Sequence, residues 1–170
     1  TKVDLEKGIL ETTRFREYIE EICAGEAWGA MDITEPNAGS DMAGLRAKAE
    51  QDENGQWLIT GEKSFITSGH AKYHFVIARS EPAPENGDDP YAGLGGLSFF
   101  LVPAWEETPD GRVYRAKVDR LEKKIGHNSS ATCAMVFDRS PGFLLGKRGE
   151  GFRYMLFLMN NARVGVAFES

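Results

Sequence analysis

The stretch LRAKAEQDENGQWLITGEKSFIT, residues 45–67, carries a strong β-structure signal. At its centre Asn54 and Gly55 form an Asn-Gly pair, and both residue types tolerate positive φ angles. The run that follows is rich in β-branched and aromatic residues, which favour strands. The segment therefore predicts a β-hairpin.

The rest of the middle of the chain contains further short strand-like runs separated by turn signals. These runs are AWGAMDI (27–33), YHFVIARS (73–80), LSFFLVP (97–103) and ATCAMVFD (131–138). No helical repeat interrupts them, which favours an antiparallel β-barrel or sandwich over a Rossmann sheet. We expect the segment EPAPENGDDPYAGLGG, residues 81–96, to be a long exposed loop.

Both ends of the chain carry apolar residues at helical spacing. Residues 3–23 predict one or two helices, and residues 150–170 predict another. We therefore divide the chain into a helical segment (1–25), a β-domain (26–140), and a loop that leads into a second helical segment (141–170). The pattern alone leaves open whether the chain is the middle of a longer protein or a complete small α+β protein.

Composition narrows the classes of partner. The chain has 170 residues, of which 41% are hydrophobic and 11% aromatic, enough for one domain with a core. Its formal charge of -6 means that the chain lacks the net positive field that would attract nucleic acid or an anionic membrane, so we expect neither partner. No segment has the pattern of a signal peptide or a membrane span, which predicts a cytoplasmic protein. Cys23 and Cys133 lie far apart and predict no metal site.

Three longer motifs occur in a characteristic order. They are AMDITEPNAGSD (30–41), ITGEKSFITSG (59–69) and LLGKRGEGFRYMLFLMNNARVGVA (144–167). Together they resemble the acyl-CoA dehydrogenase family, and KIGHNSSATCAMVFD (124–138) is similar to its larger bacterial members. The resemblance implies a middle β-domain between two helical domains, with FAD held between this β-domain and the C-terminal helices.

The resemblance also implies roles for individual residues. It implies cofactor contacts from two segments, which include Met31, Ile33, Thr34, Gly39, Ser40, Phe65, Ile66 and Thr67. Thr67 would bond near flavin N5, and Phe65 would cover the ring where many relatives have tryptophan. Ser40, Asn160 and Arg163 would contact the CoA part of an acyl-CoA substrate. Hydroxyls and amides suit this task because flavin reactivity depends on hydrogen bonds around the ring.

The implied activity is FAD-dependent α,β-dehydrogenation of an acyl-CoA thioester, as in fatty acid metabolism. The resemblance further implies electron-transfer flavoprotein as electron acceptor and a homo-oligomeric full-length protein. No catalytic residue is assigned in this chain. Ala162 stands where a minority of the family has its glutamate base, so we expect the base beyond Ser170 and an inactive isolated chain.

Two other functions remain open at this point. One is a flavin-dependent hydroxylase or acyl-CoA oxidase of the same fold, and the other is a non-catalytic β-barrel binding module. His70 and His74 have a spacing that aligns metal ligands only on a helix, so a surface or packing role is predicted. Glu35 and Asp41 are predicted to brace the turn between them rather than to form an acid/base pair.

Overall fold

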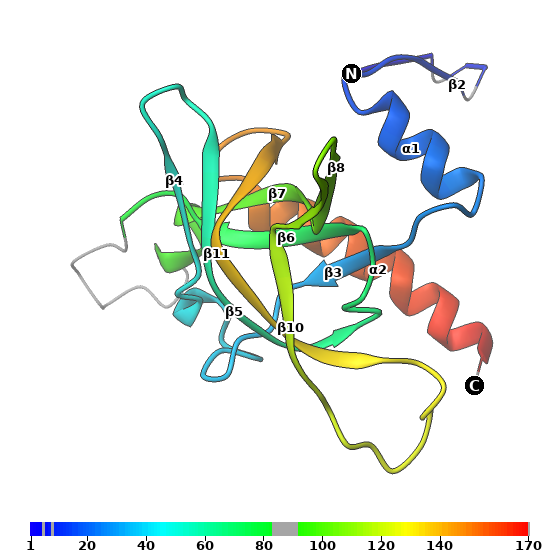
Figure 1. Cartoon of the computed structure of the whole chain (residues 1–170), viewed down its shortest axis with the longest axis vertical. Helices are drawn as coiled ribbons and strands as arrows, with labels where there is room; N and C mark the ends of the chain where they lie inside the picture. Colours follow the sequence, from blue (N-terminus) through cyan, green and yellow to red (C-terminus); the bar gives the residue numbers. More distant parts are fainter. Residues whose placement is uncertain (5, 8, 83–91, 170) are drawn as a thin grey trace.

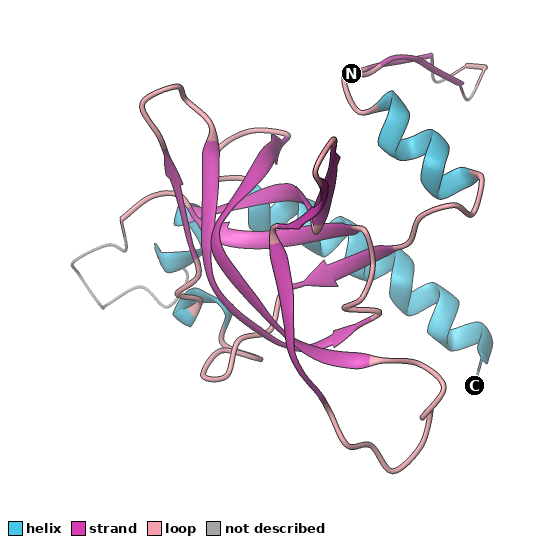
Figure 2. Cartoon of the chain, viewed as in Figure 1, coloured by secondary structure: helices cyan, strands magenta, loops and turns pink. Residues whose placement is uncertain are grey.

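The structure, a computed structural model, describes residues 1–4, 6–7, 9–82 and 92–169. Strands dominate the chain (Figure 2). Most of the loop predicted at residues 81–96 lies outside the described residues, and its end forms the short 3-10 helix η2 (Ala92–Gly96). The prediction of a mainly β fold is confirmed.

A closed barrel forms the centre of the molecule (Figure 1). The strands of this sheet are β3 (Gly29–Asp32), β4 (Lys48–Gln51), β5 (Trp57–Thr67), β6 (Tyr73–Arg79), β7 (Leu97–Pro103), β10 (Ala116–Leu121) and β11 (Thr132–Leu145). Strands β5, β4, β6, β7 and β11 pair in a ring, while β10 adds to β11 and β3 adds to β6. Most pairs are antiparallel as predicted, but β3 and β4 both run parallel to β6.

The predicted hairpin joins β4 to β5 with antiparallel pairing. Gly55 has a φ of 77°, so only Gly55 of the Asn-Gly pair uses a left-handed conformation. The Asp52 carboxylate accepts hydrogen bonds of 2.9 Å from the Asn54 and Gln56 amides. A second, unpredicted hairpin consists of β8 (Trp105–Thr108) and β9 (Gly111–Tyr114).

The barrel interior is filled by large apolar side chains. Ile59, Val76 and Phe100 are fully buried, and the Trp57 ring lies 5.3 Å from the Phe100 ring. Removing these side chains from water is the main source of stability for such a core. The Asp, Glu, Lys and His side chains that are buried in the described part of the chain are Asp32, Glu35, Lys63 and His74.

The prediction of helices across residues 3–23 is wrong for the first half of that range. This part forms a hairpin of β1 (Lys2–Asp4) and β2 (Ile9–Thr12), and only α1 (Arg16–Cys23) is helical. Branching at Cβ in residues such as Ile9 and Thr12 favours the strand. Helix α1 lies beside the barrel, where the Tyr18 ring meets the Tyr73 ring at 5.1 Å.

The C-terminal segment differs from its prediction in one respect. Strand β11 continues to Leu145, so residues 141–145 are strand rather than loop. Helix α2 (Gly151–Glu169) follows as predicted. Gly151 lies so close to β7 that an added Cβ would come within 2.5 Å of the Ser98 carbonyl carbon, which fixes the start of the helix against the barrel.

The two halves of α2 have different surroundings. Met155, in the first half, is buried against the barrel, whereas Val164, Val166 and Phe168, in the second half, are exposed. The C-terminal half extends past the barrel (Figure 1). Among the described residues, no helix combines the length and the apolar character needed to cross a membrane.

Candidate functional site

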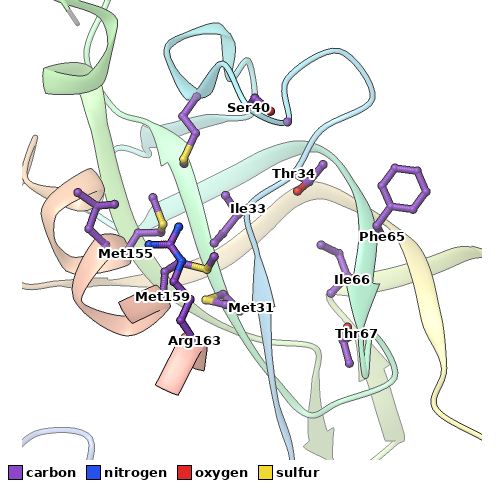
Figure 3. A pocket seen from close by; sticks show the side chains of 13 residues that line it. Met31, Ile33, Thr34, Ser40, Phe65, Ile66, Thr67, Met155, Met159 and Arg163 are labelled. Atoms are coloured by element: carbon purple, nitrogen blue, oxygen red, sulfur yellow. The ribbon is translucent and has the colours of Figure 1, made fainter. Parts of the chain in front are cut away.

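A cavity of about 430 Å³ lies where the end of β3, the end of β5 and helix α2 meet. Its lining residues are Met31, Ile33, Thr34, Gly39, Ser40, Met42, Phe65, Ile66, Thr67, Met155, Leu156, Met159 and Arg163. The cavity thus gathers every residue predicted to contact the cofactor, together with Arg163 (Figure 3). Asn160 is not among the lining residues.

The first wall follows directly from β3. The Thr34 carbonyl accepts a hydrogen bond of 2.8 Å from the Ser64 amide, which ties this segment to β5. The chain then turns between Glu35 and Ala38, whose backbones exchange hydrogen bonds of 3.0 and 3.1 Å. The Asp41 carboxylate accepts from the Ala43 amide at 3.1 Å and caps the short helix η1 (Met42–Gly44). Asp41 thus caps the end of this turn, and the Glu35 carboxylate braces it by accepting from the Arg46 and Ala47 amides, as predicted.

The second wall is the irregular end of β5. Cys133 pairs with Ile66 and Met135 with Lys63, so β5 carries one more residue than β11 between these pairs. This β-bulge places Phe65 at a φ of 59° and leaves its side chain 64% exposed. Figure 3 shows the ring at the opposite edge of the site from Met155 and Arg163. A left-handed phenylalanine is strained, and such strain clusters at functional sites.

The third wall is one face of α2. Met155, Met159 and Arg163 follow one another at intervals of four residues and therefore share a face. Sequence reasoning missed both methionines as lining residues, although this spacing was a usable signal. The Arg163 guanidinium donates a hydrogen bond of 2.9 Å to the Asn160 side-chain oxygen. The structure thus places Asn160 next to Arg163 rather than in the wall itself.

Arg163 is the one charged side chain among the described residues that line the cavity. The rest of the lining is apolar, thioether or hydroxyl in character. No described carboxylate or imidazole lines it, so a proton-abstracting group is missing from these walls. Within the described ranges, no three His, Cys, Asp or Glu side chains gather as a metal site.

A buried ion pair lies behind the first two walls. The Lys63 ammonium donates to Glu35 Oε1 at 2.9 Å and to the Ile33 carbonyl at 3.0 Å. Lys63 is fully buried and Glu35 is 7% exposed. Burial lowers the pKa of the Lys63 ammonium, and the Glu35 carboxylate partly offsets this effect.

A second buried pair joins β3 to β6. His74 Nδ1 lies 2.7 Å from Asp32 Oδ2, and both side chains are fully buried. Within the described part of the chain, Asp32 Oδ1 and His74 Nε2 have no hydrogen-bond partner. His74 thus has the packing role that its spacing predicted, in contact with the Phe137 ring at 5.7 Å.

Comparison with known proteins identifies the family. Residues 30–140 match the family model described as acyl-CoA dehydrogenase, middle domain. The chain belongs to the acyl-CoA dehydrogenase family. The resemblance seen in its motifs is thereby confirmed, and the matched residues include the segment after β3 and the end of β5, which form two of the three walls of the cavity.

Individual relatives extend this result. The chain is 34% identical over 160 residues to 3-methylmercaptopropionyl-CoA dehydrogenase of Ruegeria pomeroyi, covering 89% of this chain and 26% of that protein. The solved butyryl-CoA dehydrogenase of Megasphaera elsdenii aligns with a TM-score of 0.74 and 28% identity, over 89% of this chain and 37% of its own. A structure described as the FAD complex of PigA aligns with a TM-score of 0.64 and 27% identity, over 81% and 33%. The chain thus spans roughly a quarter to a third of the length of these relatives.

Proposed function

We propose that this chain is the flavin- and CoA-contacting β-domain of an FAD-dependent acyl-CoA dehydrogenase. The supporting observation is the single cavity that gathers both cofactor segments and the predicted CoA-facing helix. The boundaries 1–25, 26–140 and 141–170 are part of this proposal. Domains of this kind act together with the helical domains on either side.

The residues present fit FAD. The cavity volume lies in the range of small-molecule sites. Its walls offer an exposed aromatic ring at Phe65 and uncharged hydroxyls at Thr34 and Thr67, which suit a large heteroaromatic ring. When bound, FAD supplies the acceptor for the hydride that leaves the substrate Cβ. We assign Thr34 and Thr67 to hydrogen bonds with the ring, and Phe65 to covering it.

The substrate assignment rests on Ser40 and Arg163, which line the same cavity. Ser40 is exposed on the turn after the first wall, where its hydroxyl is free to meet a ligand from outside. Arg163 provides a positive charge for the anionic nucleotide end of an acyl-CoA, and Asn160 orients the Arg163 guanidinium. We assign proton abstraction to a base outside this chain, so the isolated chain is expected to be inactive.

The remaining assignments concern the whole protein. We propose electron-transfer flavoprotein as the electron acceptor and a cytoplasmic homo-oligomer as the working form. Membership of the family supports these assignments as expectations for the whole protein. The choice of electron acceptor separates this proposal from an oxidase or hydroxylase of the same fold, which would pass electrons to oxygen.

One experiment tests the proposed reaction. The full-length protein that contains this chain is purified, its FAD content is measured, and it is mixed anaerobically with a panel of acyl-CoAs. Loss of the oxidised flavin absorption band is the expected result, and the fastest acyl-CoA identifies the substrate class. Bound flavin that no acyl-CoA reduces would favour the hydroxylase, and absence of flavin would favour the binding module.

Two variants test the residue assignments. Thr67→Val removes a hydroxyl at nearly constant volume and is expected to weaken FAD binding or slow flavin reduction. Thr12→Val is a matched control, because Thr12 is exposed on β2 and does not line the cavity.

Ser40→Ala is expected to raise KM for acyl-CoA without loss of flavin. If Ser40→Ala lost flavin instead, Ser40 would belong to the cofactor site.

A further inference from the structure

We propose that Lys63 and Glu35 form a buried clamp that presets the flavin-facing surface before the cofactor binds. This inference rests on the proposed function, because it assumes that the cavity holds FAD. Neither residue lines the cavity, and their side chains are 0% and 7% exposed. They are therefore positioning residues that act through the segments they join.

The clamp connects three segments that are distant in sequence. From β5, the Lys63 ammonium reaches the Ile33 carbonyl at 3.0 Å and Glu35 Oε1 at 2.9 Å. Glu35 Oε1 also accepts from the Ala47 amide at 2.9 Å, and its Oε2 accepts from the Arg46 amide at 2.7 Å. One ion pair thus fixes the turn after β3, the entry to β4 and the end of β5 relative to one another.

The segments that the clamp joins are those assigned to the flavin. Ile33 and Thr34 form the first wall, and Phe65 follows Lys63 by two residues in the second. The Ser64 amide, between these two, donates to the Thr34 carbonyl at 2.8 Å. The position of the first wall relative to the second is therefore set by contacts within the protein, and these contacts come from the two residues that precede the strained Phe65.

The chemistry of the pair separates a positioning role from a merely structural one. Apolar residues of similar volume often replace a buried ion pair without loss of stability. Such residues cannot, however, donate a hydrogen bond to the Ile33 carbonyl. A variant that recovers stability without this bond should therefore still bind the cofactor less well, because preorganisation contributes to affinity.

The first test uses the unaltered full-length protein, after reversible removal of FAD. Hydrogen exchange is measured at the Ser64, Arg46 and Ala47 amides with and without FAD. A preset surface predicts protection that is the same within about threefold in the two forms, while amides at the cavity rim change. Exchange at these three amides that accelerates 100-fold or more without FAD, on the order of 2.7 kcal/mol, would overturn the clamp.

The second test compares double variants. Glu35→Gln with Lys63→Met removes both charges at similar volume, and Glu21→Gln with Lys72→Met does the same to a pair at 2.6 Å that lies outside the cavity. The clamp predicts that the first double variant keeps its melting temperature better than either single variant. Its FAD dissociation constant should still rise about tenfold, by analogy with the loss of one hydrogen bond. The control should keep wild-type affinity.

The outcomes distinguish the clamp from the proposed function. A Glu35→Gln/Lys63→Met protein with wild-type affinity for FAD would show that the pair is only structural. An unaltered full-length protein that binds no FAD would instead refute the proposed function. If the double variant fails to fold, the hydrogen-exchange comparison on the unaltered protein still decides the question.

Discussion

Two buried polar pairs lie in the same barrel and differ in how fully they are satisfied. In the Lys63–Glu35 pair, the ammonium has two acceptors and both carboxylate oxygens accept from backbone amides or the ammonium. In the Asp32–His74 pair, one contact of 2.7 Å joins the side chains. One polar atom of each side chain has no hydrogen-bond partner among the described residues. Both pairs are almost completely removed from solvent.

The difference shows what a buried polar pair does for a fold. A pair whose atoms are all satisfied can lock several segments together, because breaking any contact leaves an unpaired buried group. A pair with unsatisfied atoms keeps part of its desolvation penalty, so it contributes less to stability. The satisfied pair is the one that supports the candidate site.

The largest expected effect comes from removing one side of the satisfied pair. Glu35→Leu leaves the buried Lys63 ammonium without its counter-charge and two backbone amides without their acceptor, and should lower the free energy of unfolding by about 3–5 kcal/mol. Urea unfolding measures this change. Glu50→Leu, at an exposed position on β4, is the control and should change stability by less than about 0.5 kcal/mol. Equal effects at the two positions would contradict the special role of the pair.

The unsatisfied pair should respond in the opposite direction. Replacing both members, as Asp32→Val with His74→Leu, is expected to leave stability unchanged or to raise it by about 1–2 kcal/mol. Each single variant should be less stable than the double variant, since it leaves one polar group buried alone. Thermal unfolding of the two single variants and the double variant measures these differences in stability. A double variant that loses more than about 1 kcal/mol would indicate that buried water satisfies the pair.

A smaller effect is expected from the strained backbone of Phe65, two residues after the satisfied Lys63. Phe65→Gly should relieve the left-handed backbone and raise stability by up to about 1 kcal/mol, while FAD binding weakens because the ring is lost. Ser68→Gly is matched to it, with a φ of 56° but no place in the cavity wall. Ser68→Gly should raise stability without changing FAD affinity. Unfolding curves measure the stability of each variant, and FAD titration measures its affinity. Equal loss of FAD affinity in both variants would argue against the role of Phe65.

The smallest expected effect concerns the partly exposed Glu21–Lys72 pair, whose contribution to stability can be compared with that of the buried pairs. Hydrogen bonds from Lys72 and Tyr73 hold the pKa of the Glu21 carboxyl below its ordinary value of 4.5. A lowered pKa means that the contact of α1 with the barrel is stabilised above pH 4.5 and weakens as the pH falls below that value.

Glu21→Gln should remove this pH dependence and cost about 0.5 kcal/mol near neutral pH. Hydrogen exchange of the α1 amides between pH 3 and 6, on the order of the pH range in which carboxylates titrate, follows the effect. Unchanged acid sensitivity in Glu21→Gln would show that other groups hold α1 in place.

Local signals in the sequence predicted much of this protein. The Asn54-Gly55 turn, the strand-like runs and the apolar spacing of α2 each depend on neighbouring residues, so their structures could be predicted without knowledge of the fold. The same kind of signal failed at Ile9 and Leu10, where apolar residues with a helical spacing form a short strand instead. The motifs around Thr34 and Phe65 also identified the family, which comparison with known proteins confirmed.

The contacts between segments that are distant in sequence could be seen only in the folded structure. The bulge in β5 shifts the usual alternation of side chains, so Lys63 and Ser64 are both buried and Phe65 faces outward, which no strand pattern predicts. The parallel pairing of β3 with β6 brings Asp32 within reach of His74, 42 residues away in sequence. Met155 and Met159 became part of the cavity wall only when α2 packed against the barrel. Local pattern was therefore enough to predict the family and most of the elements, though not the β1–β2 or β8–β9 hairpins. The buried pairs and the shape of the cavity depend on contacts between distant segments, which form only in the folded chain.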